Sequence, residues 1–539
     1  MNDFSAPGAV ARPSWRVANL SSLLEVTSRR LPDAPALIRG DTTLSWRDLQ
    51  ARVEALAAGL LALGVGKGDR VLLHARNGFA MVEVMFACFR IGAVYAPTNF
   101  RLTPSEVIWL AQMSQARVFI CDSAFPDHAA QVAAAHGPRH VLRIGDGGGG
   151  AADTDGVIAA HAGAQVPACA VSHDDPCWFF FTSGTTGRSK AAVLTHGQLG
   201  FVVTNHIADL MPGLCSEDAS LVVAPLSHGA GVHLLAQVAR GVRSVLMPDD
   251  RFDVPTAWAL IARHRISNMF TVPTILTMLT DHPAAAAADT SGLRHVIYAG
   301  APMYRADQRA ILARLGKVIV QYFGLGEVTG CITVLPAPDH EPDDATAQHI
   351  GSCGYPRTGI DVSIQDDAGT LLPPGETGEV CAIGPAVFAG YHDNPEANAK
   401  AFRDGWFRTG DLGHMDARGF VHITGRASDM YISGGSNVYP REIEEVLLTH
   451  PDIAEAAVLG VPDPKWGESG IAICVARPGA HPEPEAILDW LAARLARYKQ
   501  PRQLLFWDAL PKSGYGKVPK RMLQAELEAR GLWPVPAPG

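Results

Sequence analysis

The chain has 539 residues, 47% of them hydrophobic and 18% charged, which is enough for roughly two to four globular domains. Its formal net charge of −9 argues against a global positive field, so we expect no nucleic-acid partner. No stretch approaches about 18 uninterrupted apolar residues, and we expect no membrane span. The cysteines lack metal-ligand spacing, which indicates reduced thiols in a cytoplasmic protein. The sequence leaves open whether the chain forms a homodimer.

The first two thirds of the chain alternate short apolar segments with helical periodicity. Ser45 and Asp48 have capping-box spacing at a helix start, residues 70–75 have a strand pattern, and a helix is expected from about Met81 to Ile91. Further strand-like segments are 118–121, 221–224, 244–247, 269–272, 296–299 and 318–321. This alternation predicts an α/β fold with largely parallel sheets.

The pattern changes in the last third. From about Ile360, shorter strands with glycine-rich turns predict a small β-rich subdomain, and Pro440 opens a new helix after Arg426. We therefore expect a large N-terminal domain, residues 1–427, made of two parallel-type α/β sheet subdomains and the β-rich subdomain. A small mobile α+β C-terminal domain, residues 428–539, would follow.

A loop of small residues follows the apolar run 178–181. The segment Thr182-Ser-Gly-Thr-Thr-Gly-Arg-Ser-Lys190 offers backbone N–H groups, hydroxyls and a lysine that can converge on phosphate oxygens. Its spacing is not Gly-x-x-x-x-Gly-Lys-Ser/Thr, so a Walker-type NTPase is not supported. The residues expected to bind polyphosphate are Thr182, Ser183, Gly184, Thr185, Thr186, Gly187 and Lys190.

Seven motifs in order, beginning with this loop, resemble the adenylate-forming (AMP-binding) superfamily of acyl-CoA synthetases, aryl-CoA ligases, adenylation domains and luciferases. The other six are Pro225-Leu-Ser-His228-Gly, Tyr298-Ala-Gly-Ala-Pro302, Gln321-Tyr-Phe-Gly-Leu-Gly-Glu327, Trp406-Phe-Arg-Thr-Gly-Asp411, Gly425-Arg426 and Pro511-Lys-Ser-Gly-Tyr-Gly-Lys517. The resemblance covers most of the chain. It implies an ATP-dependent carboxylate:CoA ligase that forms an acyl-adenylate and then an acyl-CoA thioester, releasing pyrophosphate and AMP.

The resemblance also implies roles in the first half-reaction. Asp411, which we expect in a tight turn, and Arg426 would hold the AMP ribose or a phosphate. Glu327 would be the Mg²⁺ ligand, and Lys517 would bind the reacting carboxylate and the α-phosphate. Tyr322 or Phe323 would stack on adenine. The other expected AMP contacts are Gly300, Ala301, Pro302, Gln321 and Gly324.

For the second half-reaction, His228 is a candidate gate between the acyl pocket and the thiol entrance, and Ser428 is the expected hinge. The expected acyl pocket comprises His228, His233, Gly300, Met303, Leu325, Gly326 and Cys331. The expected CoA contacts are Ser433, Gly434, Gly435, Trp466 and Lys499. Because the pocket segments hold no lysine or arginine, we expect an aryl or medium-chain monocarboxylate as the small-molecule substrate.

Two departures from the family pattern keep alternatives open. Gly326 stands where the family usually has threonine, so it either loses a phosphate contact or makes room, and Ser428 stands where a charged hinge residue is common. The alternatives are a stand-alone adenylation enzyme that loads a separate carrier protein, a luciferase-like oxygenase, and a non-catalytic nucleotide-binding sensor.

Overall fold

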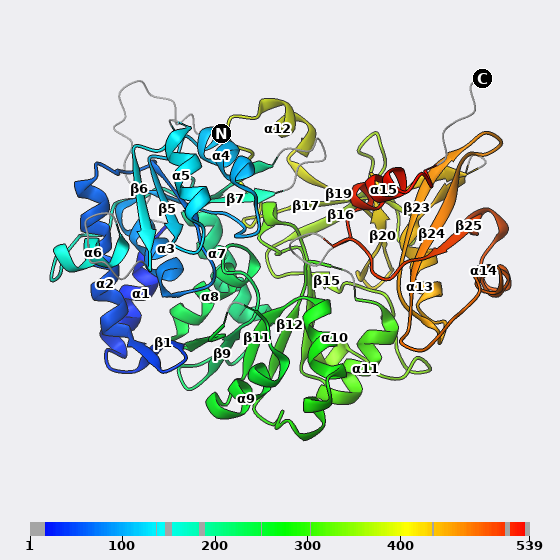
Figure 1. Cartoon of the computed structure of the whole chain (residues 1–539), viewed down its shortest axis with the longest axis horizontal. Coiled ribbons are helices and arrows are strands. Elements are labelled where there is room, and N and C mark those ends of the chain that lie inside the picture. The colour runs from blue at the N-terminus through cyan, green and yellow to red at the C-terminus, as the bar shows by residue number, and fades with distance from the viewer. Residues whose placement is uncertain are drawn as a thin grey trace.

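The computed structural model describes residues 17–135, 137–145, 153–182, 189–249, 251–301, 303–433, 436–512 and 518–533. Two large sheets with their helices form the bulk of the molecule, and the C-terminal part stands to one side of them (Figure 1). The α/β architecture predicted from the sequence is confirmed, including the β-rich subdomain and the small C-terminal α+β domain. Among the helices that the structure describes, none combines the length and the apolar character needed to cross a bilayer.

The first sheet has six strands in the order β6-β5-β3-β4-β7-β8. They are β3 (Arg70–His74), β4 (Val94–Pro97), β5 (Val118–Asp122), β6 (His140–Ile144), β7 (Pro176–Thr182) and β8 (Lys190–Thr195). Neighbours are parallel except for the β7–β8 hairpin. The helices of this half are α1 (Ser21–Arg30), α2 (Trp46–Ala62), α3 (Phe79–Ile91), α4 (Pro104–Met113), α5 (Pro126–Ala134) and α6 (Thr154–Ala160). The capping box that opens α2 is present at Ser45 and Asp48.

The second sheet has nine strands in the order β15-β14-β13-β12-β11-β9-β10-β1-β2. They are β1 (Pro35–Arg39), β2 (Thr42–Ser45), β9 (Ala219–Val222), β10 (Arg243–Leu246), β11 (Asn268–Thr271), β12 (His295–Tyr298), β13 (Ile319–Phe323), β14 (Thr333–Leu335) and β15 (Tyr355–Pro356). Its helices are α7 (His196–Asn205) continued by a π-helical turn (His206–Leu210), α8 (Gly229–Arg240), α9 (Val254–His264), α10 (Pro273–Asp281) and α11 (Arg305–Leu315). The predicted strands are present, with ends shifted by one or two residues.

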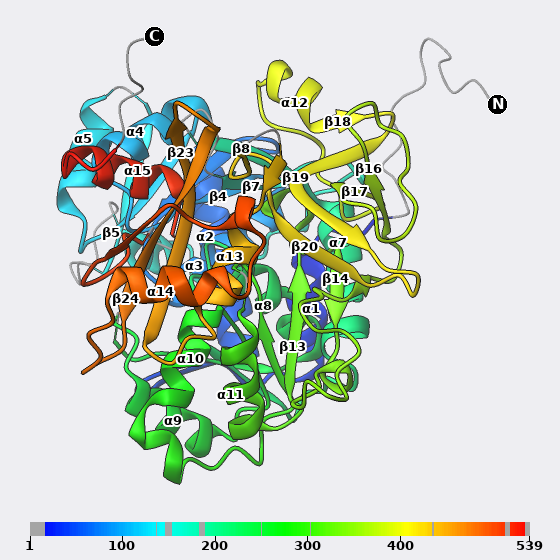
Figure 2. The ribbon, with the colours of Figure 1, turned by 90° about the vertical axis from the view of Figure 1, so that its right-hand side faces the viewer.

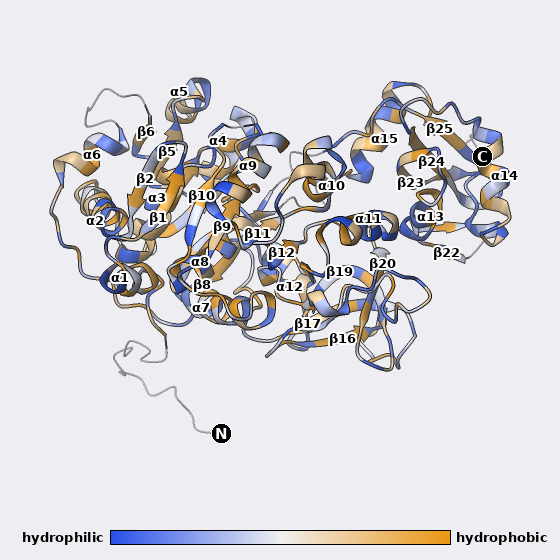
Figure 3. Cartoon of the chain, turned by 90° about the horizontal axis from the view of Figure 1, so that it is seen from below, coloured by the Kyte–Doolittle hydropathy of each residue, from blue (hydrophilic) through white to orange (hydrophobic). Residues whose placement is uncertain are grey.

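The second sheet separates two hydrophobic cores, because successive side chains of a strand point to opposite faces. Phe270 and Tyr322 belong to the inner core, which α3 and α8 share with the first sheet, whereas Met269 and Tyr298 belong to the outer core beneath α9 to α11. Figure 3 shows the hydrophobic residues concentrated on the strands and on helix faces turned toward them. The strands are therefore buried on both faces, as their continuous apolar runs predict.

The remaining two sheets belong to the end of the chain. The third contains β16 (Asp361–Gln365), β17 (Gly378–Ile383), β18 (Phe402–Arg403), β19 (Trp406–Met415) and β20 (Val421–Arg426), near α12 (Pro395–Ala401). The fourth contains β21 (Tyr431–Ser433), β22 (Ser436–Val438), β23 (Ile453–Asp463), β24 (Gly467–Ala476) and β25 (Gln503–Phe506). Its helices are α13 (Pro440–Leu447), α14 (Pro484–Ala492) and α15 (Lys520–Ala529) (Figure 2). Tyr304, just before α11, packs against this last core, and its hydroxyl donates to Glu444 Oε2 at 3.4 Å.

Candidate active site

The end of the β7–β8 hairpin brings together Thr182, Lys190 and the loop that carries Glu327. Thr182 is paired directly opposite Lys190, so the phosphate-loop segment leaves and re-enters the sheet at one point. A Cβ built on Gly326 would lie 3.3 Å from Thr182 Cγ2, which places the Glu327 loop against the same strand end. Ser183, Gly184, Thr185, Thr186 and Gly187 lie outside the described residues.

Tyr391 links the cation and the carboxylate of this site. Its hydroxyl donates to Glu327 Oε1 at 2.8 Å, and Lys190 Nζ lies 4.2 Å from the centroid of its ring. Burial and the neighbouring Glu327 raise the pKa of Tyr391 far above its usual range, so the phenol stays neutral and remains a donor. The sequence reasoning missed Tyr391, because a single tyrosine after a glycine carries no recognisable chemical pattern.

Glu327 lies in a short 3-10 helix, Gly326–Val328, and is 5% exposed. Its backbone oxygen accepts a hydrogen bond from Phe388 N at 2.8 Å, which fixes the turn against the segment that holds Tyr391. In the part of the chain that the structure describes, no three His, Cys, Asp or Glu side chains gather into a metal-binding group. One buried carboxylate beside the expected phosphate-binding loop suits Mg²⁺ that arrives with phosphate oxygens, because this ion is usually held by one or two carboxylates plus phosphates and water.

Asp411 pairs with Arg426 across two adjacent strands. The Arg426 Nε donates to Asp411 Oδ1 at 2.9 Å, and the Asp411 side chain is 6% exposed, against 48% for Arg426. The expectation of a tight turn at Asp411 is wrong, since the residue lies within β19. The strand is distorted there, because Gly410 has φ +72° and the pairing with β17 skips a register step. Such a bulge redirects a side chain without ending the strand.

The two aromatic residues of β13 that were expected near adenine differ in burial. Tyr322 points into the inner core and stacks on Phe270, with ring centroids 5.8 Å apart at 18°. Gln321 lies on the opposite face of the strand, where its Oε1 accepts a hydrogen bond from Tyr298 at 3.0 Å. Phe323 is half-buried and packs against the same inner core as Tyr322. Gly324 must be glycine, because a Cβ there would lie 2.5 Å from the Gly330 backbone.

The segment after β12, where contacts to AMP were expected, has an exposed backbone. Gly300 is exposed at φ +83°, a conformation that favours glycine, and Ala301 is half-buried. Pro302 lies outside the described residues.

His228 stands at the N-terminal end of α8, facing Phe180. Its Nδ1 lies 2.8 Å from Ser227 Oγ, and its ring meets the Phe180 ring edge-to-face with centroids 5.0 Å apart. The first helical residue is Gly229, where a Cβ would lie 2.7 Å from Phe270 Cζ. The position between His228, Phe180 and Phe270 is therefore tightly packed.

The residues expected around the acyl group divide between the two faces of the second sheet. His233 and Cys331 are buried on the inner side with Tyr322, and Leu325 packs against the same core. Met303 belongs to the outer core, on the face away from Tyr322. This position follows from the register of the strand and the helix beyond it, which the sequence motif does not reveal.

A buried arginine lies near the expected acyl pocket but outside its motif segments. Arg357 is fully buried beside Tyr322, with its Cζ 5.9 Å from that ring centroid, and its Nη1 donates to Gly330 O at 3.4 Å. Asp209 of the π-helical turn lies 3.8 Å from Arg357 Nε and pairs with its charge. Since Arg357 comes from the β15–β16 connection, outside the motif segments, the sequence pattern did not point to it.

The expected hinge lies in an exposed turn between the third and fourth sheets. Ser428 Oγ donates to Asp429 Oδ1 at 3.1 Å, and the backbone N–H of Asp429 returns to Arg426 O at 3.0 Å. Ser433 ends β21 and pairs with Ser436 across the hairpin. Gly434 and Gly435 lie outside the described residues, as does Lys517.

The two other expected CoA contacts lie in the C-terminal domain. Trp466 is flanked by Lys465 Nζ and Arg502 Cζ, each 5.2 Å from its ring centroid. Lys499 Nζ donates to both carboxylate oxygens of Glu442, at 2.6 and 2.8 Å, so its charge is already paired. Trp466 with its two cations is the better placed of these groups for a nucleotide.

Comparisons with known proteins agree with this arrangement. The family described as AMP-binding enzyme matches residues 24–392, and the AMP-binding enzyme C-terminal domain matches residues 442–517. A feruloyl-CoA synthase from Amycolatopsis sp is 38% identical over 495 residues, spanning 92% of this chain and 96% of that protein. The fatty acid–acyl-carrier-protein ligase ScoC from Streptomyces coeruleorubidus is 32% identical over 515 residues, spanning 94% and 96%.

The structural comparison gives the same result. The crystal structure of ATP-bound MatB from Rhodopseudomonas palustris has a TM-score of 0.85 and 30% identity, covering 95% of this chain and 99% of that one. The chain therefore belongs to the AMP-binding enzyme family and is an enzyme of its acyl-CoA ligase group.

Proposed function

We propose that the protein is an ATP-dependent carboxylate:CoA ligase that activates an aryl or medium-chain monocarboxylate. The observation that carries this proposal is the convergence of Lys190 and Glu327 on Tyr391 at the end of the phosphate-loop hairpin. A cation and a carboxylate held on either side of one neutral phenol suit a magnesium–polyphosphate complex. Asp411, beside Arg426, would accept hydrogen bonds from the ribose hydroxyls.

In the first half-reaction, a carboxylate oxygen attacks the α-phosphorus in line and pyrophosphate leaves, which gives the acyl-adenylate. This step needs positioning and charge neutralisation more than a protein nucleophile. Lys190 and Lys517 would supply positive charge, and Phe323 is the aromatic side chain that we propose to stack on adenine. Mg²⁺ held by Glu327 would neutralise charge on the phosphate oxygens when bound.

In the second half-reaction, the CoA thiol attacks the acyl carbonyl and AMP leaves. We propose that the C-terminal domain, residues 428–539, turns about Ser428 against residues 1–427 between the two steps. His228 would open the thiol entrance. The segment 433–435 would contact the pantetheine, and Trp466 would hold the nucleotide end of CoA. All nine cysteines are free, in keeping with a cytoplasmic protein.

The aromatic class of substrate is favoured by the feruloyl-CoA synthase relative. The carrier-protein ligase relative keeps a second candidate open, in which the acyl group passes to the thiol of a separate carrier protein. The two candidates share the first half-reaction and differ only in the thiol acceptor.

The test is turnover of a panel of aryl and aliphatic carboxylates by the full chain with ATP, Mg²⁺ and CoA, reading AMP, pyrophosphate and thioester. We expect all three products with at least one acid, and loss of all three in Glu327→Gln. The matched control is Glu396→Gln, which changes an exposed glutamate paired with Lys400 on α12. AMP that accumulates only with a carrier protein would favour the second candidate. Nucleotide binding without turnover of any acid would contradict both.

A further inference from the structure

Two asparagine side chains each hold a backbone segment of the candidate active site by a reciprocal pair of hydrogen bonds, which we call an asparagine clamp. The first is Asn77, in the turn between β3 and α3. Its Nδ2 donates to Ala224 O at 2.9 Å, and its Oδ1 accepts from Leu226 N at 2.9 Å. The clamp therefore fixes the backbone on both sides of Pro225, and it joins a loop of the first sheet to the segment between β9 and α8 of the second.

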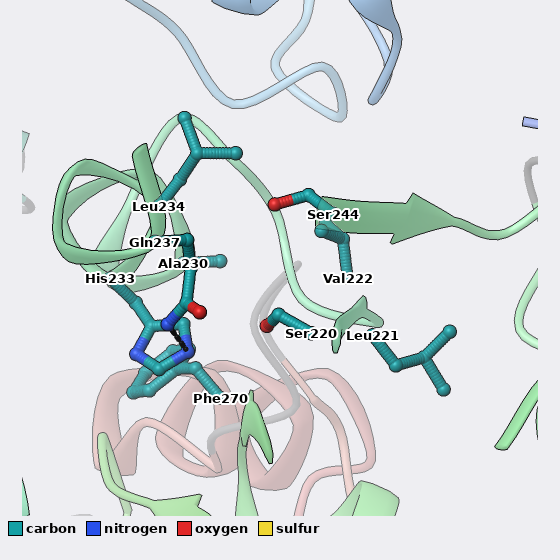
Figure 4. A pocket seen from close by; sticks show the side chains of 9 residues that line it. All are labelled: Ser220, Leu221, Val222, Ala230, His233, Leu234, Gln237, Ser244 and Phe270. Carbon is teal, nitrogen blue, oxygen red and sulfur yellow. Dashed lines mark hydrogen bonds between the residues drawn. The ribbon is translucent and has the colours of Figure 1, made fainter. Parts of the chain in front are cut away.

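The segment held by Asn77 leads to His228. Pro225 O accepts a hydrogen bond from His228 N at 3.1 Å, so the position of the fixed peptide determines where His228 begins α8. The segment is also in close contact with the helix, because a Cβ on Gly231 would clash with Leu226 O. Behind the helix, the cavity between α8, β9 and β10 measures about 10 Å³, room for roughly one water molecule (Figure 4). A shift of the segment would therefore displace His228, since little empty space is present to absorb it.

The second clamp is Asn398, which holds the backbone of Tyr391 from helix α12. Its Oδ1 accepts from Tyr391 N at 2.6 Å, and its Nδ2 donates to Tyr391 O at 3.0 Å. A Cβ on Gly390, which has φ +118°, would lie 3.0 Å from Asn398 Oδ1, so the amide fits closely against a glycine. The Tyr391 hydroxyl donates to Glu327, and its ring faces Lys190. Asn398 therefore fixes the residue that links the cation and the carboxylate of the site.

The two clamps lead to residues that serve different chemical steps. Tyr391 belongs to the magnesium–polyphosphate part of the site, whereas His228 belongs to the thiol entrance. We propose that Asn398 and Asn77 are positioning residues, the first for formation of the acyl-adenylate and the second for formation of the thioester. Both lie outside the seven motif segments. The inference rests on the proposed ligase function and adds to it a residue that controls each half-reaction.

The test measures the two half-reactions separately in the full chain. Carboxylate-dependent exchange of labelled pyrophosphate into ATP without CoA reports adenylation, and thioester formation from preformed acyl-adenylate reports transfer. Asn77→Ala should slow transfer about tenfold or more and leave exchange nearly unchanged, because a small misplacement at a reacting centre is costly. Asn398→Ala should raise the KM for magnesium–ATP in the exchange several-fold and leave transfer nearly unchanged. Each variant is thus the control for the other.

Two smaller changes keep the test valid if an alanine variant does not fold. Aspartate retains the acceptor for the backbone N–H of each clamp and loses the donor to the carbonyl, so Asn77→Asp and Asn398→Asp should divide between the half-reactions in the same way. A control for helix stability is Asn394→Ala, which removes the N-cap bond from Ala397 N at 3.0 Å but leaves the clamp on Tyr391. It should lower the melting temperature and leave both half-reactions near wild type.

Several results would overturn the inference while leaving the ligase function intact. These are equal slowing of both half-reactions by a clamp variant, wild-type rates in the variants of either clamp, or a reversed division between them. A rise in the KM for magnesium–ATP in Asn394→Ala as large as that in Asn398→Ala would also overturn it, because helix stability alone would then explain the effect. Wild-type protein that shows neither exchange nor thioester formation with any acid would instead contradict the ligase function itself.

Discussion

Replacing Gly326 with threonine tests whether this glycine marks a lost phosphate contact or a packing requirement. A Cβ at this position would lie 2.5 Å from both Cδ1 and Cε1 of Phe180. The Phe180 ring is 8% exposed and already meets His228 edge-to-face, so it has little freedom to withdraw. Such overpacking costs about 1–3 kcal/mol. A regained hydrogen bond to phosphate would contribute about 0.5–1.5 kcal/mol, so the strain should win.

We therefore expect Gly326→Thr to lower the thermal unfolding midpoint and to lower kcat/KM for short and bulky acids alike. The assay is AMP release with one acid of each kind, together with a melting curve. The control is the same substitution in a Phe180→Leu background, where the clashing ring edge is gone. There the threonine should be tolerated, and any benefit of its hydroxyl should appear as a rise in kcat/KM over Phe180→Leu alone.

Improved turnover in the single variant at unchanged stability would refute this reasoning, because the Phe180 ring would then have moved aside without destabilising the fold. Selective loss of the bulky acid would refute it differently, by showing that position 326 makes room for substrate rather than for Phe180.

Four further predictions follow from the site. Lys517→Ala should abolish most adenylate formation but leave thioester formation from preformed adenylate nearly intact, and equal loss of both would contradict its role. Ser428→Pro should fix φ, so that adenylate accumulates while transfer to CoA slows in single-turnover assays; wild-type transfer would exclude it as the pivot. Tyr391→Phe should raise the KM for magnesium–ATP several-fold, because it releases the carboxylate from its phenol, and an unchanged KM would show that this contact is only structural. Burial lowers the pKa of both His196 and His340 to about 4, below the unfolded value near 6.5, so stability should fall as pH drops from about 6.5 toward 4. A melting midpoint that does not fall from pH 7 to pH 5 would contradict this.

The alternation of apolar strands with amphipathic helices was enough to predict the sheets, because buried parallel strands leave a strong local pattern. Glu327, Lys190 and Asp411 could be assigned to one expected site because each lies in a recognisable local motif and the motifs occur in the family's order. Arg357 and Tyr391 were missed because their importance arises from tertiary contacts with residues far away in the chain. The continuation of β19 through Asp411 could not be predicted either. Gly410 is typical of a turn in sequence, although it forms a bulge within the strand.

The two faces of the second sheet show a further limit. Tyr322 and Phe323 are adjacent and chemically alike, yet Tyr322 is buried in the inner core and Phe323 is only half-buried against it. Met303 likewise follows a motif that suggested the acyl pocket, yet it packs in the outer core. The sequence predicts that successive side chains of a strand point to opposite faces of the sheet, but it does not predict which face is turned toward the inner core.

The central claim, an acyl-adenylate formed before any thiol is needed, is tested most directly by carboxylate-dependent exchange of labelled pyrophosphate into ATP in the absence of CoA. We expect exchange with an accepted acid and none without it, followed by release of AMP when CoA is added. Exchange that requires CoA, or the formation of ADP and phosphate in place of AMP and pyrophosphate, would contradict the account.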